Sequence, residues 1–156
     1  MLSSRTEQSI AVHSREFPAV PAALAEVRSF MRDRCADGGI AGAPADDLLL
    51  AVSEACANAV LHSGSASFRV TWQQRGGRIE VRIADEGTFD RAIPSGDRPG
   101  GNGLPLMTAV MDEISVRRGT ARRPGTEVRL VKRLSAGEER APRAVRFRPR
   151  RSLVRR

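Results

Sequence analysis

The chain has 156 residues and a formal net charge of +8, with 40% hydrophobic and 28% charged residues. This length fits one domain and this composition is close to the globular average, which excludes wholesale disorder. No apolar run reaches the ~20 residues needed to cross a bilayer, and the opening residues lack the pattern of a secretory signal. We therefore expect a soluble cytoplasmic protein with no membrane partner. Cys35 and Cys56 lack CxxC spacing, which excludes a zinc ribbon or a disulfide framework.

The positive charge is concentrated at the C-terminal end. Residues 135–156 contain eight arginines against two glutamates, whereas residues 1–134 are nearly neutral. The dense like charge and scarcity of apolar residues predict a disordered tail that follows a domain at 1–134. Phe147 is the only aromatic residue of the tail, so we expect nucleic-acid binding to be non-specific at most. Contact with an acidic protein partner is the alternative. Lys132 is the one lysine beside 25 arginines, a bias typical of a GC-rich genome.

Two helices are predicted in the first half of the chain, after a weak extended stretch at 9–13. Apolar residues recur at three- and four-residue steps from Leu24 to Met31, which indicates one face of a helix that ends at an Ala-Asp-Gly-Gly stop. The second helix begins near Pro44, since proline is favoured in a first turn, and continues to Gly64. Its many apolar residues indicate that it is mostly buried.

Strands and turns dominate the second half of the chain. A short helix is expected at 104–111, after a loop at 86–100 that is rich in glycine and proline and long enough to be functional. Gly76-Gly77 and the segment 119–125 are expected to turn between paired strands. The strands are predicted at 68–72, 79–83, 114–118 and 126–134. Helices and antiparallel strands segregate, which predicts an α+β two-layer sandwich with a mixed, largely antiparallel sheet.

Glu54 and Asn58 are polar residues on the mostly buried second helix. They are four residues apart and therefore share one face. A carboxylate beside an amide could activate a hydroxyl and hold a hard cation such as Mg²⁺. Because this spacing is common, a solvated face or a hydrogen-bonded pair is the simpler interpretation of the spacing alone.

Two further segments interrupt apolar elements. Asp85 ends a strand, where a carboxylate could accept a hydrogen bond from an exocyclic amine, and Gly87 would let a ring approach the backbone. The glycines of 100–104 precede a helix, where backbone N–H groups suit an anion such as a phosphate. No GK[ST] follows them, so the segment is not a Walker A loop. Each segment alone also fits an ordinary turn or hinge.

The order and spacing of these segments resemble those of the GHKL ATPases, which have the Bergerat, histidine-kinase-like ATPase fold. More narrowly, AVSEACANAVLHS with GGNGLPLM is similar to the anti-sigma-factor serine kinases of bacterial partner switching. The resemblance covers about residues 8–134. It is carried by Glu54-x-x-x-Asn58, Asp85-x-Gly87, Gly101-x-Gly103-Leu104 and Gly125-Thr126.

The resemblance implies a role for each residue of the first two motifs. Glu54 would be the catalytic general base that polarises the acceptor hydroxyl. Asn58 would be the metal ligand, holding an Mg²⁺ that bridges the phosphates of ATP. Asp85 would bind the adenine amine, with Gly87 beside the ring.

The remaining motifs are implied to complete the ATP site. Gly101, Gly103 and the backbone of Leu104 would cradle the phosphates, and Thr126 would support the adenine pocket. Residues 88–100 would form a lid over the nucleotide.

Four other residues bear on this interpretation. Arg91 or Arg98 in the implied lid would reach a phosphate. Phe89 stands where many family members carry a second glycine, which bears on how tightly nucleotide is held. His62 is interpreted as a helix-end packing or capping residue and not as a catalyst. No helix with an acceptor histidine precedes the domain, which favours a standalone kinase over a fragment of a sensor histidine kinase.

The resemblance implies an ATP- and Mg²⁺-dependent protein serine/threonine kinase that acts as an anti-sigma factor. Its substrate would be an anti-anti-sigma (STAS-type) protein, and phosphorylation of that protein would free the kinase to capture a sigma factor. A homodimer is expected by analogy. The alternative is a nucleotide-binding regulatory module with weak or no kinase activity that works by protein binding.

Overall fold

The computed structural model describes residues 10–87, 103–134 and 146–147. The implied lid, with Phe89, Arg91 and Arg98, and Gly101 lie outside the described residues, as does most of the tail. The described elements are β1 (Ala11–Pro18), α1 (Ala23–Asp37), α2 (Ala43–His62), β2 (Ser67–Arg75), β3 (Arg78–Asp85), α3 (Gly103–Val110), β4 (Glu113–Thr120), β5 (Arg123–Arg133) and β6 (Arg146–Phe147).

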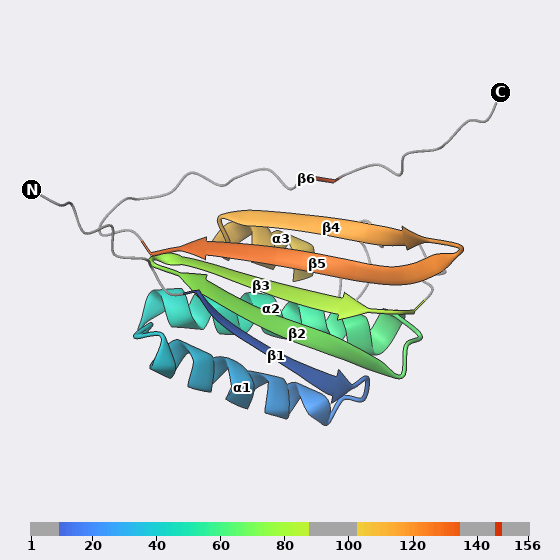
Figure 1. Cartoon of the computed structure of the whole chain (residues 1–156), viewed down its shortest axis with the longest axis horizontal. Helices are drawn as coiled ribbons and strands as arrows, with labels where there is room; N and C mark the ends of the chain where they lie inside the picture. Colours follow the sequence, from blue (N-terminus) through green and yellow to red (C-terminus); the bar gives the residue numbers. More distant parts are fainter. Residues whose placement is uncertain (1–9, 88–102, 135–145, 148–156) are drawn as a thin grey trace, which may run out of the picture.

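One sheet forms the frame of the molecule, with strand order β1-β2-β3-β5-β4-β6. The first five strands in this order are antiparallel to their neighbours, and β6 pairs in parallel with β4. The helices lie on one side of the sheet, with α1 and α2 next to β1–β3 and α3 next to β4 and β5 (Figure 1). This confirms the predicted two-layer α+β fold with a largely antiparallel sheet.

The helices begin and end close to where the sequence predicts. Helix α1 is capped by Gly38, whose N–H donates to the carbonyl oxygen of Arg34 at 3.0 Å. Helix α2 follows Gly42, which has a φ of +64°, a conformation that glycine adopts without strain. Pro44 lies in the first turn of α2, as expected. The glycines that end α1 and precede α2, and the proline at the start of α2, therefore lie at helix boundaries as the sequence predicts.

The hydrophobic core lies between the helices and the sheet. Successive strand residues point to opposite faces, so the helix side takes every second residue of each strand. Cys35 and Cys56 are both buried and free. No helix among the described residues is long and apolar enough to span a membrane. The largest fully buried side chains include Phe17, Met31, Leu48, Phe68, Trp72 and Leu130.

The turn predicted at 119–125 is shorter in the structure, where it comprises residues 121 and 122. Strands β4 and β5 continue through most of it, with Thr120 paired to Arg123. Gly119 lies in β4, and a Cβ there would lie 2.0 Å from the carbonyl oxygen of Arg123. The two glycines therefore permit close backbone approaches within a long hairpin instead of forming its turn.

The first strand is also longer than predicted. It runs from Ala11 to Pro18, whereas the pattern indicated residues 9–13. Only Phe17 of this strand is buried, because β1 is an edge strand and most of its side chains are exposed. A strand with one buried residue gives little alternation to detect.

Candidate functional site

Helix α2 carries the first two predicted site residues. It packs against α1, α3, β3 and β5, and its buried residues include Ala51, Ala55 and Ala59. Glu54 and Asn58 are half-buried, one position before each of the last two of these. Their side chains therefore lie at the margin of the packed face, where polar groups can meet both the core and a ligand.

The end of α2 is in close contact with the Asp85–Gly87 turn. A Cβ at Gly87 would lie 1.8 Å from the carbonyl oxygen of Ser63 and 2.9 Å from the amide nitrogen of Ser65. Only glycine permits this approach, because the atoms it meets are backbone atoms that cannot swing away. Ser63 is fully buried and directly follows α2. The turn after β3 is thus fixed against the helix that carries Glu54 and Asn58.

Asp85 is half-buried and has no salt bridge among the described residues. Its Oδ1 accepts a hydrogen bond from the N–H of Gly87 at 3.0 Å. Burial raises the pKa of this carboxyl, and hydrogen bonds from the backbone N–H groups of Gly87 and Thr126 offset part of the rise. A carboxylate has more acceptor sites than these two bonds use, so Asp85 can accept a further hydrogen bond from a ligand.

Thr126 lies directly opposite Asp85 in the β3–β5 ladder, so both side chains point to the same face of the sheet. The Oγ1 of Thr126 is buried and has no hydrogen-bond partner among the described residues. A buried hydroxyl normally finds a partner. The preceding Gly125 has a φ of +136°, and a Cβ there would lie 2.4 Å from the carbonyl oxygen of Asp85. The pair therefore combines an acceptor with an unsatisfied hydroxyl in a tight backbone setting.

Helix α3 begins at Gly103 and packs against α2. Leu104 is half-buried in its first turn, and its carbonyl accepts a hydrogen bond from the Oγ1 of Thr108 at 2.8 Å. The backbone N–H groups at the start of a helix are free to bind an anion. The structure therefore presents α3 beside the helix that carries Glu54 and Asn58. Gly101 lies outside the described residues.

Lys132 makes two contacts between elements of the site that were not predicted from the sequence. Its Nζ lies 2.6 Å from the Oδ2 of Asp47 and donates to the carbonyl oxygen of Val110, also at 2.6 Å. It thereby joins the start of α2 to the end of α3 from β5. A cation is favourable at the carbonyl end of a helix, and a carboxylate at the amide end. The one sequence feature that could have drawn attention to Lys132 is that it is the single lysine in a chain with 25 arginines.

His62 lies in the last turn of α2 and is exposed. The helix does end there, and the packing or capping role of His62 stays a prediction. Within the described ranges, no group of three or more His, Cys, Asp or Glu residues gathers as a metal site. Asn58 is the residue that the resemblance implies as a metal ligand.

Comparison with known proteins bears on the whole arrangement. The histidine kinase-like ATPase domain family matches residues 17–132. A protein of Bacillus velezensis described as serine-protein kinase RsbW is 32% identical over 120 residues, covering 65% of this chain and 75% of its own length. The protein of the same description from Bacillus subtilis is 38% identical over 92 residues, covering 46% of this chain and 56% of its own length.

A solved structure is similar in fold. The structure of the RsbU and RsbW domains of Rv1364c from Mycobacterium tuberculosis matches with a TM-score of 0.65 and 24% sequence identity. The match covers 89% of this chain but 35% of that larger one. Both layers of the fold are therefore present in a solved relative.

Proposed function

The chain belongs to the histidine kinase-like ATPase domain family, and from this premise we propose that it is an ATP-dependent protein serine/threonine kinase that acts as an anti-sigma factor. Its acceptor would be an anti-anti-sigma protein of the STAS type. The similarity to two proteins described as serine-protein kinases supports the kinase class. The sigma factor and the anti-anti-sigma protein are proposed as partners from the motif resemblance to anti-sigma-factor serine kinases, together with the similarity to these two RsbW proteins.

The observation that carries the proposal is the pair formed by Asp85 and Thr126. An adenine edge presents an exocyclic amine next to a ring nitrogen, which need an acceptor and a donor. The Asp85 carboxylate and the Thr126 hydroxyl, which has no partner in the described part of the chain, supply this combination side by side. Guanine carries a carbonyl in place of the amine, and a carboxylate would repel it. The described residues therefore fit an adenine nucleotide.

Residues further along α2 and at the start of α3 would serve the phosphates. The side-chain oxygen of Asn58 is a suitable ligand for Mg²⁺, which would neutralise phosphate charge when bound. Backbone N–H groups at Gly101, Gly103 and Leu104 would hold the phosphate oxygens. These assignments rest on the family motif and on the packing of α3 against α2.

Glu54 would act on the acceptor protein. Its carboxylate would accept the proton of a serine or threonine hydroxyl as that oxygen bonds to the terminal phosphorus and ADP leaves. Glu54 lies one helical turn before Asn58 on the same face of α2, so proton acceptor and metal ligand are held by one rigid element. Positioning and electrostatics carry most of the catalysis in phosphoryl transfer.

A second function is favoured by one residue of the sequence. Phe89 occupies a place that often holds glycine in this family, in the segment that the motif assigns to the lid. A bulky residue there would hinder closure of the lid over the nucleotide and so weaken nucleotide binding. In that case the chain would be a nucleotide-binding regulatory module that works by capturing partners.

The two functions differ in what happens to a captured protein. The chain is used as bait with and without ATP and Mg²⁺, and captured proteins are examined for new phosphoserine or phosphothreonine. Kinase function predicts phosphate on a captured small protein, and transfer slowed about 10²–10⁴-fold by Glu54→Gln. The near-isosteric change should leave ATP binding intact.

Asn58→Ala is the matched variant, since it should remove Mg²⁺-ATP binding itself while the protein stays folded. Transfer at the wild-type rate by Glu54→Gln would show that Glu54 is not the base. Capture without any phosphate transfer by the wild type would replace the kinase with the regulatory module.

A further inference from the structure

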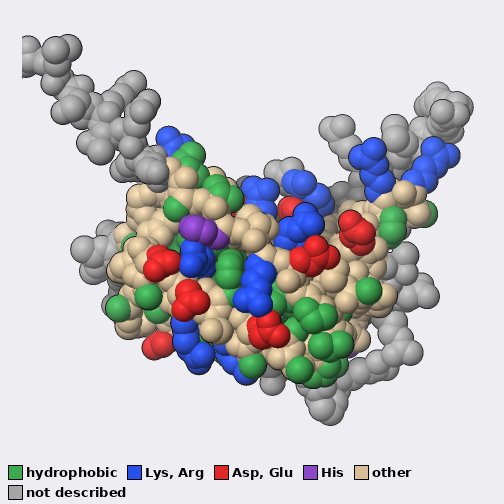
Figure 2. Space-filling model, turned by 60° about the horizontal axis from the view of Figure 1, so that its bottom comes forward, with side chains coloured by type: hydrophobic (Ala, Val, Ile, Leu, Met, Phe, Trp, Pro, Cys, Tyr) green, Lys and Arg blue, Asp and Glu red, His purple; other side chains and the backbone are tan. Residues whose placement is uncertain are grey.

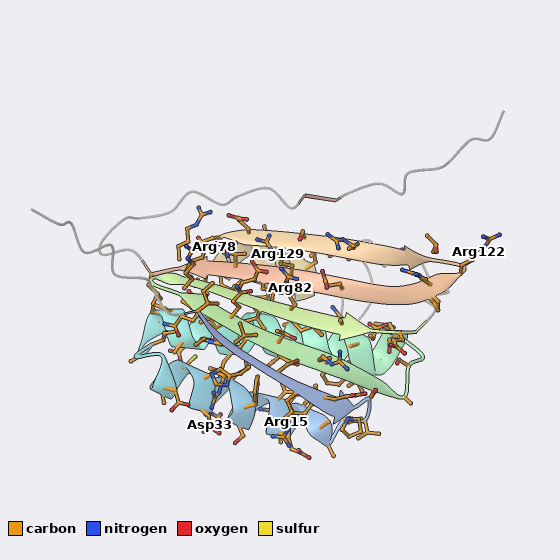
Figure 3. The ribbon with its side chains drawn as sticks, viewed as in Figure 1. Arg15, Asp33, Arg78, Arg82, Arg122 and Arg129 are labelled. Carbon is orange, nitrogen blue, oxygen red and sulfur yellow. The ribbon has the colours of Figure 1, made fainter. Side chains whose placement is uncertain are left out.

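The face of the sheet turned away from the helices carries a group of charged side chains. Figure 3 shows Arg78, Arg82 and Arg129 gathered on β3 and β5, far from Arg15 and Asp33 on the β1 and α1 side. We call this group the arginine cluster. It consists of Arg78, Glu80, Arg82, Glu113, Arg129 and Arg133.

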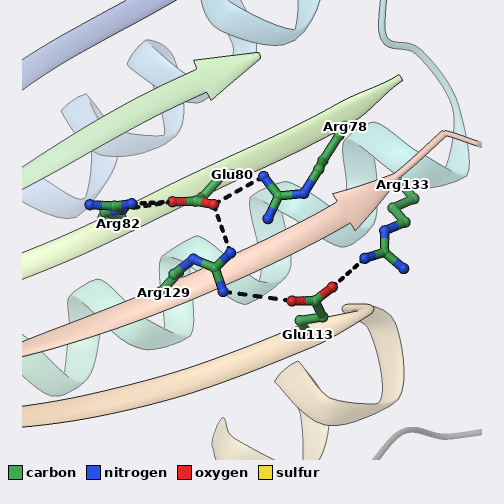
Figure 4. Close-up of polar contacts among 6 residues, drawn as sticks. All are labelled: Arg78, Glu80, Arg82, Glu113, Arg129 and Arg133. Atoms are coloured by element: carbon green, nitrogen blue, oxygen red, sulfur yellow. Dashed lines mark hydrogen bonds and ion pairs between the residues drawn. The ribbon is translucent and has the colours of Figure 1, made fainter. Parts of the chain in front are cut away.

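Glu80 is the centre of the arginine cluster, with only 6% of its side chain exposed. Its Oε1 lies 2.6 Å from Nη2 of Arg82 and accepts a hydrogen bond from Nε of the same residue at 2.7 Å. Its Oε2 lies 3.0 Å from Arg78 and 2.9 Å from Arg129 (Figure 4). One carboxylate is thus surrounded by three guanidinium groups.

Glu113 extends the arginine cluster from β4. It lies 3.6 Å from Nη1 of Arg129 and also accepts a hydrogen bond from Arg133. The arginine cluster therefore contains four arginines and two glutamates, so that every arginine has an acidic partner but the cluster keeps an excess of two positive charges. A guanidinium has five N–H donors, and these contacts use one or two of them in each arginine.

The arginine cluster is held in place by packing as well as by charge. Val131 is fully buried, yet it is not part of the core beneath the helices. It pairs with Glu80 on one side and with Glu113 on the other, so it lies under the cluster. Arginine stems commonly cover apolar surface while their heads stay in water. The side chains of Arg78 and Arg82 remain 40% and 46% exposed.

We propose that the arginine cluster is a docking surface for a protein segment rich in aspartate and glutamate. Guanidinium groups bind carboxylates in a two-pronged geometry, and groups that are already ordered lose little entropy on binding. The excess of positive charge sets the sign of the partner. Glu80 fixes the arginines in place and leaves most of their donors for that partner.

Three other occupants fit less well. Nucleic acid binding on a sheet uses aromatic side chains for stacking, and the aromatic residues of β2, Phe68 and Trp72, are buried on the helix side. The chain's own residues 135–156 carry eight arginines against two glutamates, so like charge disfavours them. A second copy would bring one positive cluster against another.

This surface is separate from the candidate nucleotide site. Glu80 and Asp85 lie on the same strand, but at positions of opposite parity, so their side chains point to opposite faces. An acidic segment could therefore bind while nucleotide is bound or absent.

The test uses the full chain and a Glu-Ser repeat peptide, with a Gln-Ser peptide as the neutral control. Wild type should bind the acidic peptide at about 0.15 M salt, a level that screens weak long-range attraction. Arg78→Gln with Arg82→Gln should weaken binding by at least about tenfold, since each loses charge-assisted hydrogen bonds. Arg129 remains beside Glu80 in this variant.

Two control variants also remove two positive charges each. Arg28→Gln with Arg32→Gln changes exposed residues of α1, on the side where Figure 2 shows acidic and basic side chains interspersed. Arg150→Gln with Arg151→Gln changes the tail. Both should keep binding within about twofold, because they leave the docking geometry intact. Equal weakening by all three variants, or a larger loss from the tail variant, would overturn the proposal.

A second measurement needs no variant. Backbone amide shifts of the wild-type chain should respond to the acidic peptide at residues 80–82 and 129–131 and not at 85–87. The proposal is wrong if the shifts lie elsewhere, if no binding occurs, or if DNA of equal charge binds more tightly than the peptide. Self-association that disappears in the Arg78, Arg82 variant would assign the surface to a second copy instead.

Discussion

Strand β3 carries two carboxylates in opposite electrostatic situations. Glu80 faces away from the helices, where burial alone would raise its pKa, but Arg129, Arg82 and Arg78 lower it to about 2. Asp85 faces the helix side, where burial raises its pKa and backbone N–H groups are the opposing influence. One carboxylate is therefore fully compensated by cations of the chain, and the other is not.

This difference is the one expected between a structural acid and the ligand-binding acid that we propose Asp85 to be. A carboxylate that has its cations contributes to folding, and its removal leaves unmatched positive charge. A carboxylate kept partly desolvated without a cation costs folding free energy and is typical of a functional site. Glu80 and Asp85 should therefore respond in opposite ways to neutral, nearly isosteric substitution.

The largest expected effect on stability is that of Glu80→Gln. It leaves three guanidinium groups around a neutral side chain, and breaking a buried ion pair costs about 3 kcal/mol. Urea unfolding at neutral pH measures the loss. Glu16→Gln is the matched control, because Glu16 is exposed and lies 3.6 Å from one arginine, Arg69. A loss no larger than that of the control would show that Glu80 is not a structural acid.

Gly87→Ala should have the next largest effect. The added methyl would meet the backbone oxygen of Ser63 at 1.8 Å, and such overpacking costs about 2 kcal/mol or more. Gly64→Ala is the control, since a Cβ there meets no atom within 4 Å and its φ of +66° adds only strain of about 1 kcal/mol. Thermal unfolding compares the two. Equal losses would contradict the close contact between the Asp85–Gly87 turn and α2.

Acid should weaken wild type through Glu80. Its pKa falls from an ordinary value of 4.5 to about 2 on folding, so its contribution is complete above pH 4.5 and is lost as the pH falls toward 2. Unfolding free energies of wild type and Glu80→Gln should therefore converge as the pH is lowered through this window. The difference between the two proteins removes the contribution of the other carboxylates. A constant difference across the window would contradict the lowered pKa.

Asp85→Asn should change stability least. The pKa of Asp85 is raised on folding, so its ionised form disfavours the folded state at neutral pH and the neutral amide removes that cost. The asparagine oxygen can still accept from the N–H of Gly87. Urea unfolding should give a free energy equal to that of wild type or slightly higher. A loss comparable to that of Glu80→Gln would make Asp85 a structural residue as well.

The sequence predicted the helices well because their signals are local. Three- and four-residue steps of apolar residues, with Pro44 near one start and glycines at both ends, mark α1 and α2 without knowledge of what they pack against. The turn within 119–125 was predicted too long because the sequence alone does not show whether a glycine forms a turn or permits a close contact between strands. Gly119 and Gly125 permit contacts with Arg123 and Asp85, which lie on paired strands.

Only the local part of the candidate site could be predicted from the sequence. Asp85 and Gly87 are conspicuous at a strand end, but the approach of Gly87 to Ser63 depends on how α2 lies against the sheet. The arginine cluster was not predicted at all. Arg129 reaches Glu80 because β5, and not β4, is the neighbour of β3, and strand order is a property of the whole fold.

Titration calorimetry with ATP and GTP in the presence of Mg²⁺ tests the central claim, that Asp85 is the adenine-binding acid of a nucleotide site. We predict that wild type binds ATP and not GTP, because the Asp85 carboxylate accepts from the amine of adenine. Asp85→Asn should remain folded and bind ATP at least about tenfold more weakly, since a hydrogen bond to a charged group contributes about 1.5–3 kcal/mol. Equal affinity for the two nucleotides, or unchanged ATP affinity in the folded variant, would contradict the account.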